Sequence, residues 1–263
     1  MLRDAEAGTD TRTWIELSGR WIDIAPFGNN NFVALSVDGH VYTRIAGELK
    51  QLEGVLRGIT STPDGKCWWG FNQCGQLYTC QGDGIWENVC NDKLRVKSIL
   101  YMHEATASGF EGQNLFVLTE HKHVWRFSLD SGHWTQITTL APLIFAACLF
   151  PMADTQKDQT SRLCFANSDR RAWAVVHTDC VSSSSAGSDI ETGCIVNDPS
   201  TPGHRSSLVV DSQHRIVCIH PTGTPQGASY PPEAPRAKLL RAHLDAVYAI
   251  TDAGALFWSP GSQ

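Results

Sequence analysis

The sequence predicts an all-β fold: a six-bladed β-propeller of four-stranded antiparallel blades, closed by its own N-terminal strand. Three observations predict this fold. A hairpin pattern recurs along the whole chain, apolar segments flank most of its copies, and one strand-like segment near the N-terminus has no hairpin of its own. No long amphipathic helix pattern interrupts the series.

Each copy of the hairpin pattern is an apolar strand, a tight polar turn, and an aliphatic residue that an aromatic one usually follows. Consecutive copies start between 36 residues (Phe32 to Trp68) and 48 residues (Leu115 to Leu163) apart. That spacing is typical of one propeller blade per copy. The copies are Phe32–Arg44, Trp68–Cys80, Leu115–Phe127, Leu163–Val175, Ser207–Ile219 and Val247–Ser259.

Aligned on the turn, the copies share columns of constant character. Asp38-Gly39 is the strongest turn signal, because glycine readily adopts the positive φ that twisted hairpins need. The aliphatic column is Val41, Leu77, Val124, Ala172, Ile216 and Leu256, and the column after it is Tyr42, Tyr78, Trp125, Trp173, Val217 and Phe257. A mostly small column, expected to let neighbouring blades approach closely, is Ala34, Gly70, Val117, Phe165, Val209 and Ala249.

The apolar segments before the hairpins are expected to be the innermost strands. They are Trp21–Ala25, Leu56–Thr60, Val96–Tyr101, Leu143–Leu149, Gly193–Val196 and Leu239–His243. Outer strands are expected at Leu49–Leu52, Trp86–Val89 and Trp134–Ile137, whereas those of the fourth and fifth blades are poorly marked. The last blade has no outer strand after its hairpin, so Trp14–Leu17 is expected to complete it and remove an exposed sheet edge.

The predicted organisation is a single domain over residues 1–263, with residues 1–13 a flexible N-terminus. The formal net charge of −6 argues against nucleic-acid binding, which usually needs a basic surface. The N-terminal residues are polar and no apolar run approaches the length of a membrane span, so neither a signal peptide nor a membrane partner is expected. The nine scattered cysteines contain no Cys-x-x-Cys pair and are expected to be reduced, in a cytoplasmic protein.

Motifs for nucleophilic hydrolysis, zinc proteolysis, phosphate loops and dinucleotide binding are absent from the sequence. We therefore expect no cofactor, and no histidine or cysteine spacing predicts a metal site. An enzyme that needs no cofactor stays open, because it acts by shaping its substrate and placing one or two hydrogen bonds.

The first two blades resemble the tectonin repeat. In the first, the matching residues are Trp14, Leu17, Gly19, Trp21 and Ile24, followed by Asp38-Gly39-His40-Val41-Tyr42. In the second, they are Leu52, Gly54, Leu56, Ile59, Trp69-Gly70-Phe71-Asn72 and Gly75-Gln76-Leu77-Tyr78. The later blades keep the hairpin but lose most of the glycines. Tectonin-type propellers include lectins, so the resemblance implies glycan binding.

Long insertions are expected on one face of the ring, in blades three to five, opposite a plain face of short turns. They are Met102–Gln113, Pro151–Ser161, His177–Ile190, Asn197–Arg205 and Pro221–Pro235. Loops carry function more often than strands do, so these insertions are candidates for a binding or catalytic site. They can equally be solvated loops without a site. Trp68 and Trp69 alternate across one strand, so one ring is expected to pack between blades while the other can stack on a ligand. The candidate ligand-binding residues are Trp68, Trp69, His103, Glu104, His177, Asp179, His204 and Tyr230.

Three functions remain open. The first is a tectonin-like lectin whose partner is a glycan. The second is a cofactor-free pocket enzyme, of the cyclase, isomerase or cycloaddition (hetero-Diels–Alder) type, that acts on a small apolar molecule. The third is a protein-interaction platform. The unequal blades favour a single site, whereas a multivalent lectin usually repeats its binding residues in every blade.

Overall fold

The computed structural model describes residues 14–28, 30–89, 94–103, 112–121, 123–138, 148–153, 161–166, 172–176, 179–182, 190–197, 205–211, 213–219, 234–243 and 246–260. Within these ranges the chain consists of strands and turns, with no helix. No helix long and apolar enough to cross a membrane is therefore found in the described part. The predicted N-terminal segment, residues 1–13, lies outside the described residues.

The first three sheets are antiparallel and have four strands each, in sequence order. The first is β2 (Trp21–Phe27), β3 (Asn31–Ser36), β4 (His40–Ile45) and β5 (Glu48–Val55). The second is β6 (Gly58–Ser61), β7 (Trp68–Phe71), β8 (Leu77–Cys80) and β9 (Glu87–Asn88). The third is β10 (Val96–His103), β11 (Gln113–Thr119), β12 (Val124–Ser128) and β13 (His133–Thr138).

The remaining strands continue the same arrangement. The fourth sheet is β14 (Cys148–Ala153), β15 (Ser161–Ala166), β16 (Ala172–Val176) and β17 (Asp179–Ser182). The fifth has three described strands, β18 (Ile190–Asn197), β19 (Arg205–Asp211) and β20 (Ile216–Ile219). The sixth is β21 (Leu239–His243), β22 (Ala246–Ile250) and β23 (Leu256–Ser259), completed by β1 (Ile15–Leu17) from the other end of the chain.

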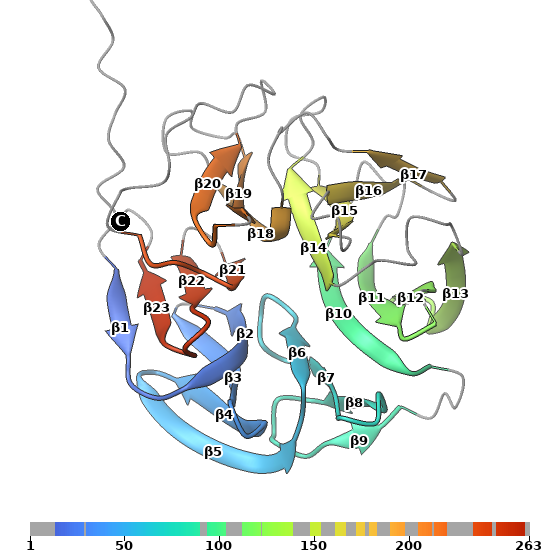
Figure 1. The fold of residues 1–263 in the computed structure, drawn as a ribbon. Helices are drawn as coiled ribbons and strands as arrows, with labels where there is room; N and C mark the ends of the chain where they lie inside the picture. Colours follow the sequence, from blue (N-terminus) through green and yellow to red (C-terminus); the bar gives the residue numbers. More distant parts are fainter. Residues whose placement is uncertain are drawn as a thin grey trace, which may run out of the picture.

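The sheets stand around a central axis, which makes the protein an all-β propeller (Figure 1). The first strand of each sheet lies nearest the axis, and β5, β9, β13, β17 and β1 lie at the rim. Each inner strand contacts the inner strand of the sheet on either side, and the series returns from β21 to β2. The predicted closing strand is confirmed at β1, where Ile15, Glu16 and Leu17 pair with Trp258, Phe257 and Leu256.

All the predicted hairpins are confirmed, and they share one register. The small column pairs directly with the aromatic column, as in Ala34 with Tyr42, Gly70 with Tyr78 and Ala249 with Phe257. The same register pairs Val117 with Trp125, Phe165 with Trp173 and Val209 with Val217, so the register is shared although the small residue is not kept in every hairpin.

Strand bounds differ from the prediction where the sequence pattern is weakest. The inner strand expected at Leu143–Leu149 is β14, which lies later in the chain and includes Pro151. The inner strand expected at Gly193–Val196 extends over all of β18. The fourth sheet also has an outer strand, β17, inside the segment His177–Ile190 that was expected to be an insertion, so that expectation is wrong for Asp179–Ser182. Its polar and small residues carry no apolar alternation, so the backbone ladder alone identifies it.

Among the described residues, an equivalent backbone hydrogen bond joins a sheet to the next at four places. The residue that ends the middle turn has a positive φ, at Gly39, Gly75, His214 and Gly254. Its carbonyl oxygen accepts the N–H of the residue that begins the next inner segment, at 2.7 to 2.9 Å. We call these donors the joining residues; they are Trp21, Leu56, Val96 and Ala237.

In each middle turn that the structure describes, the first residue holds the turn shape with its side chain. Asn72 Oδ1 accepts the N–H groups of Cys74 and Gln76, both at 3.0 Å, and Asp211 Oδ1 accepts those of Gln213 and Arg215. Side-chain oxygens that mimic a backbone acceptor in this way stabilise turns. The other described middle turns use hydroxyl groups, those of Ser36, Thr119 and Thr251.

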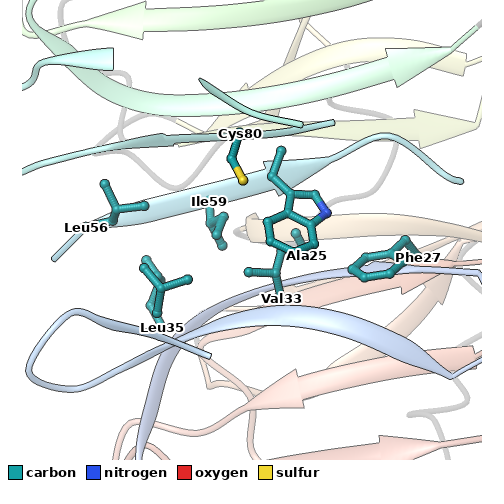
Figure 2. Close-up of a cluster of buried hydrophobic side chains, with 9 residues drawn as sticks. Ala25, Phe27, Val33, Leu35, Leu56, Ile59 and Cys80 are labelled. Atoms are coloured by element: carbon teal, nitrogen blue, oxygen red, sulfur yellow. The ribbon is translucent and has the colours of Figure 1, made fainter. Parts of the chain in front are cut away.

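Apolar side chains fill the space between neighbouring sheets. Between the first and second sheets they come from both sides and meet in one cluster (Figure 2). Val33 and Ile59 there are 0% and 1% exposed, and full burial of such a side chain contributes roughly 1.5–3 kcal/mol. A matching cluster between the last and first sheets contains Trp21, Phe32 and Tyr248, so side-chain packing supports the closure.

Candidate functional site

The residues predicted to bind a ligand on the elaborated face fall mostly outside the described part of the chain. Glu104, His177, His204 and Tyr230 lie outside the described residues altogether. His103 ends β10 and Asp179 begins β17, but only their backbone is described. Their role in a site therefore stays a prediction.

Trp68 and Trp69 are both described, and both rings pack between sheets. Trp68 is 1% exposed and lies 5.8 Å from Phe27 and 6.4 Å from Trp86, measured between ring centroids. Trp69 is 4% exposed and stacks on Tyr101 at 5.7 Å, with an interplanar angle of 7°. The expectation that one ring of the pair is open to a ligand is not met, because sheets pack on both sides of β7.

The tryptophans of the rim also pack. Trp86 contacts the cluster between the first two sheets, and Trp134 lies 5.0 Å from Phe127. Trp86 Nε1 is buried without a hydrogen-bond partner, so its ring is held by packing and not by a polar contact. These aromatic residues therefore serve the packing of the fold.

A cleft opens on the plain face, between the second and third sheets. It has a volume of about 280 Å³ and is bordered by short segments of four regions of the chain. The connection before β6 contributes one residue, the end of β7 and its turn contribute three, β10 contributes two and the turn after β11 contributes one. The lining residues are Arg57, Phe71, Asn72, Gln73, Val96, Lys97 and Glu120.

Backbone hydrogen bonds fix the walls of this cleft. The N–H of Arg57 donates to the carbonyl oxygen of Phe71 at 2.7 Å, and the N–H of Val96 donates to that of Gly75 at 2.9 Å. On the far wall the N–H of Glu120 donates to the carbonyl oxygen of Arg95 at 2.7 Å. Each wall is thus tied to a strand of its own sheet or of the next one, which makes the cleft a preformed site.

Asn72 shapes the cleft more than it offers groups to a ligand. Its Oδ1 holds the turn, and its Nδ2 donates to Gln76 Oε1 at 2.8 Å and to the Tyr78 hydroxyl oxygen at 3.3 Å. The side chain of Gln73, next along the turn, is exposed at the tip. A ligand in the cleft would therefore meet the Gln73 amide before it meets Asn72.

The surface that lines the cleft is mainly polar. Phe71 and Val96 are buried, whereas Arg57, Lys97 and Glu120 are exposed. These side chains supply fixed donors, a carboxylate acceptor and an amide that does both. They contain no paired nucleophile and base, and no group of three histidine, cysteine, aspartate or glutamate residues suited to a metal ion occurs in the described ranges.

One buried ion pair lies on the inner strands, where the last sheet meets the first. Asp23 Oδ1 lies 3.4 Å from a guanidinium nitrogen of Arg241, and Asp23 Oδ2 accepts the N–H of Ile59 at 3.0 Å. The side chains of Asp23 and Arg241 are 13% and 18% exposed. Burial raises the pKa of Asp23, and the opposing effects of Arg241 and of two N–H donors do not cancel it. The pair links three inner strands, which indicates a structural role at the closing seam.

The comparisons with known proteins agree with the fold. No family model matches the chain, and no curated protein matches it. A solved structure of virginiamycin B lyase from Staphylococcus aureus is similar over 94% of this chain and 98% of its own, with a TM-score of 0.59 and 11% sequence identity. The likeness shows the fold alone.

Two further solved structures give the same result. A protein of unknown function from Bacteroides thetaiotaomicron is similar over 97% of this chain and 73% of its own, with a TM-score of 0.63 and 12% identity. BBS1N, solved in complex with ARL6DN, is similar over 89% of this chain and 75% of its own, with a TM-score of 0.57 and 12% identity. The neighbours are propellers of varied function, so the comparison supports the fold and does not indicate an activity.

Sequence reasoning did not identify the cleft. It directed attention to long loops, whereas the cleft lies among short turns on the opposite face. Phe71 and Asn72 do belong to the segment that resembles the tectonin repeat, but their adjacency to Lys97 and Glu120 depends on how two sheets meet. The one feature of the sequence that could have indicated the cleft is the basic character of the residues beside the joining residues.

Proposed function

We propose that this protein is a glycan-binding propeller of the tectonin type, and that it holds its ligand in the cleft between the second and third sheets. One observation carries the proposal: a cleft whose walls are fixed by backbone hydrogen bonds and whose rim carries amide, guanidinium, ammonium and carboxylate groups. Sugar hydroxyl groups both donate and accept hydrogen bonds, and this rim supplies partners for both. The volume of the cleft suits a small ligand or one end of a longer chain.

The proposed site is not repeated between the first and second sheets. At the corresponding place there, Ile22 replaces Arg57 and Val37 replaces Gln73, by their position relative to the joining residue and the turn. Ile22 and Val37 are 40% and 39% exposed, so that place presents apolar side chains. A polar cleft at one of these two places and apolar side chains at the other fit a protein that recognises one ligand end.

The ring that carries this site is, in our proposal, six-bladed. The six sheets and the continuous series of contacts between their inner strands support this count. The fifth sheet would obtain its outer strand from the segment between β20 and β21, which lies outside the described residues.

A glycan array tests the function, and one pair of variants tests the site. The wild-type chain is expected to bind at least one glycan above background, with an intensity that rises with protein concentration. Gln73→Trp fills the cleft with an indole and is expected to abolish this binding. Val37→Trp, the control, places the same ring at the same turn position of the first sheet. Absence of binding to every glycan at several protein concentrations would exclude the lectin.

A cofactor-free enzyme is the second candidate. The observation in its favour is the likeness, over nearly its full length, to a propeller whose name is that of a lyase. Its site would lie on the elaborated face, near His103, Glu104, His177 and Asp179. An isomerase or cyclase changes the chromatographic retention of a metabolite without changing its mass. Such a change in a small-molecule extract, with the native but not the heat-denatured protein, supports this candidate, and its absence counts against it.

A further inference from the structure

The residues on either side of the joining residues are strongly basic. A joining residue gives its N–H to the preceding turn, and the four of them are buried. The residues before and after them are Arg20 and Ile22, Val55 and Arg57, Arg95 and Lys97, and Arg236 and Lys238. All but Ile22 and Val55 are arginine or lysine, although lysine and arginine make up only 21 of the 263 residues. We call these six basic residues the cationic ring.

Every member of the cationic ring is exposed. Because the joining residue between two flanking positions points into the core, the two side chains beside it point the other way, toward solvent. The joining bonds recur at equivalent positions of the sheets, so these side chains lie on one face, around the axis. A protein with a net charge of −6 thus presents a cluster of positive charge on its plain face.

Few described carboxylates on that face oppose this charge. In the middle turns that the structure describes, the exposed acids are Asp38, Glu120 and Asp252. Asp252 lies 2.9 Å from the Nδ1 atom of His214, and the carboxylate of Asp211 is bound by Arg215 at 2.7 Å. Glu120 is the one acid that lines the cleft, against two cations, Arg57 and Lys97.

We propose that the ligand of the cleft is an anionic glycan, a chain that carries carboxylate or sulfate groups. This inference rests on the proposed function and deepens it. One sugar unit lies in the cleft with its anionic group against Arg57 and Lys97, and the units beyond it follow the cationic ring along the plain face. Arginine and lysine both bind such groups with charge-assisted hydrogen bonds, and arginine does so with two parallel bonds.

The physics of exposed charges sets the expected behaviour. Each exposed ion pair contributes little by itself, so affinity grows with the number of charges engaged. Salt weakens such binding, because the screening length falls to about 8 Å at physiological ionic strength. Binding to an anionic glycan should therefore weaken steeply with salt, whereas binding to a neutral one should not.

Calorimetric titration with two probes of equal length, a sulfated dextran oligosaccharide and an unmodified dextran oligosaccharide, tests the proposal. At about 50 mM salt the sulfated probe is expected to bind at least tenfold more tightly, a difference of about 1.4 kcal/mol. The double variant Arg57→Gln/Lys97→Gln is expected to lose about tenfold in affinity for the sulfated probe. The control Lys50→Gln/Lys66→Gln removes two exposed charges, one on β5 and one in the loop before β7, and is expected to stay within twofold.

The outcomes separate the two proposals. Equal affinity for both probes overturns the anionic ligand but leaves a glycan-binding cleft. Tight binding of the sulfated probe that the Arg57→Gln/Lys97→Gln variant retains overturns the assignment to this face. A single-stranded oligonucleotide of equal charge that binds more tightly than the sulfated probe overturns the glycan class. Absence of binding to any carbohydrate removes the proposed function as well.

Discussion

Replacement of Arg241 by methionine should destabilise the ring, and more so at neutral than at acidic pH. The substitution leaves the carboxylate of Asp23 buried without its cation at the seam between the last and first sheets. At 3.4 Å and an effective dielectric constant of about 20, the Coulomb attraction alone is about 5 kcal/mol. Loss of one partner of a buried pair costs about 3–5 kcal/mol, and partial exposure places this pair near 3.

The pH dependence follows from the pKa of Asp23. In the folded protein burial raises this pKa above its usual 3.8, so the folded state binds the proton more tightly than the unfolded chain. Stability from this group is therefore present at low pH and is lost as pH rises from 3.8 through the folded pKa. Removal of Arg241 raises the folded pKa further and widens that window. The variant should thus lose about 3 kcal/mol at pH 7 and clearly less at about pH 4.5.

Urea unfolding at both pH values measures this prediction. For a chain of this size, about 3 kcal/mol also corresponds to a fall in Tm of roughly 6–12 °C at pH 7. The exposed control Arg57→Met should change stability by less than about 0.5 kcal/mol at either pH. The double variant Asp23→Asn/Arg241→Met should recover part of the loss, because no charge is then left buried. An equal loss at both pH values would refute the reasoning, since only a titrating Asp23 produces the difference.

Three further predictions concern the joins between sheets and the acid limb of stability. Alanine at Gly39 (φ 80°) or at Gly47 (φ 88°) would have to adopt a similar positive φ. Only at Gly39 would the added Cβ also lie 2.6 Å from the Leu56 carbonyl oxygen. Gly39→Ala should therefore cost about 1–3 kcal/mol more in urea unfolding than Gly47→Ala, and equal costs would contradict the close approach. Burial lowers the pKa of His243 below 6.5, so the unfolded chain binds this proton more tightly and stability falls as pH drops from 6.5 through the folded pKa. His243→Gln should make that slope shallower, and an unchanged slope would exclude the assignment. Deletion of residues 1–17 removes β1 and should lower the Tm by several degrees, because β23 becomes an exposed edge; an unchanged Tm would disprove the closure.

The hairpins were predictable because their signal is local. A turn glycine, an aliphatic residue and an aromatic one lie within a few positions, and a two-residue period assigns each to a face. The partner of Trp14–Leu17 was also predictable, because the last hairpin is the one with no segment left after it for an outer strand. In the structure Ile15–Leu17 pairs with that hairpin. The bounds of β14 and β17 were not predictable, because proline, polar and small residues there give no alternation and the backbone ladder decides.

The cleft was not predictable, because no local pattern marks it. Its lining comes from positions as distant as Arg57 and Glu120, which meet only when two sheets pack at a fixed angle. The same distance in sequence hid the Asp23–Arg241 pair, whose members are separated by nearly the whole chain. Trp68 and Trp69 show the opposite case, because two conspicuous residues suggested a ligand site where there is none. Each ring instead packs in one of the two interfaces between β7 and the neighbouring sheets.

The cationic ring is informative because the fold does not require it. Each join is a hydrogen bond between backbone groups, a turn carbonyl and the N–H of a buried joining residue, and the Arg20 side chain also donates to the turn, from Nε to the Ala253 carbonyl oxygen at 3.3 Å. Ile22 and Val55 show that a join does not need a charged neighbour, since apolar residues occupy such positions without breaking it. Six like charges at equivalent positions around one face repel one another and lower stability, although screening keeps the cost small. The fold does not require this repulsion between like charges, so its presence supports a ligand for the cationic ring. A ligand of opposite charge would offset the repulsion.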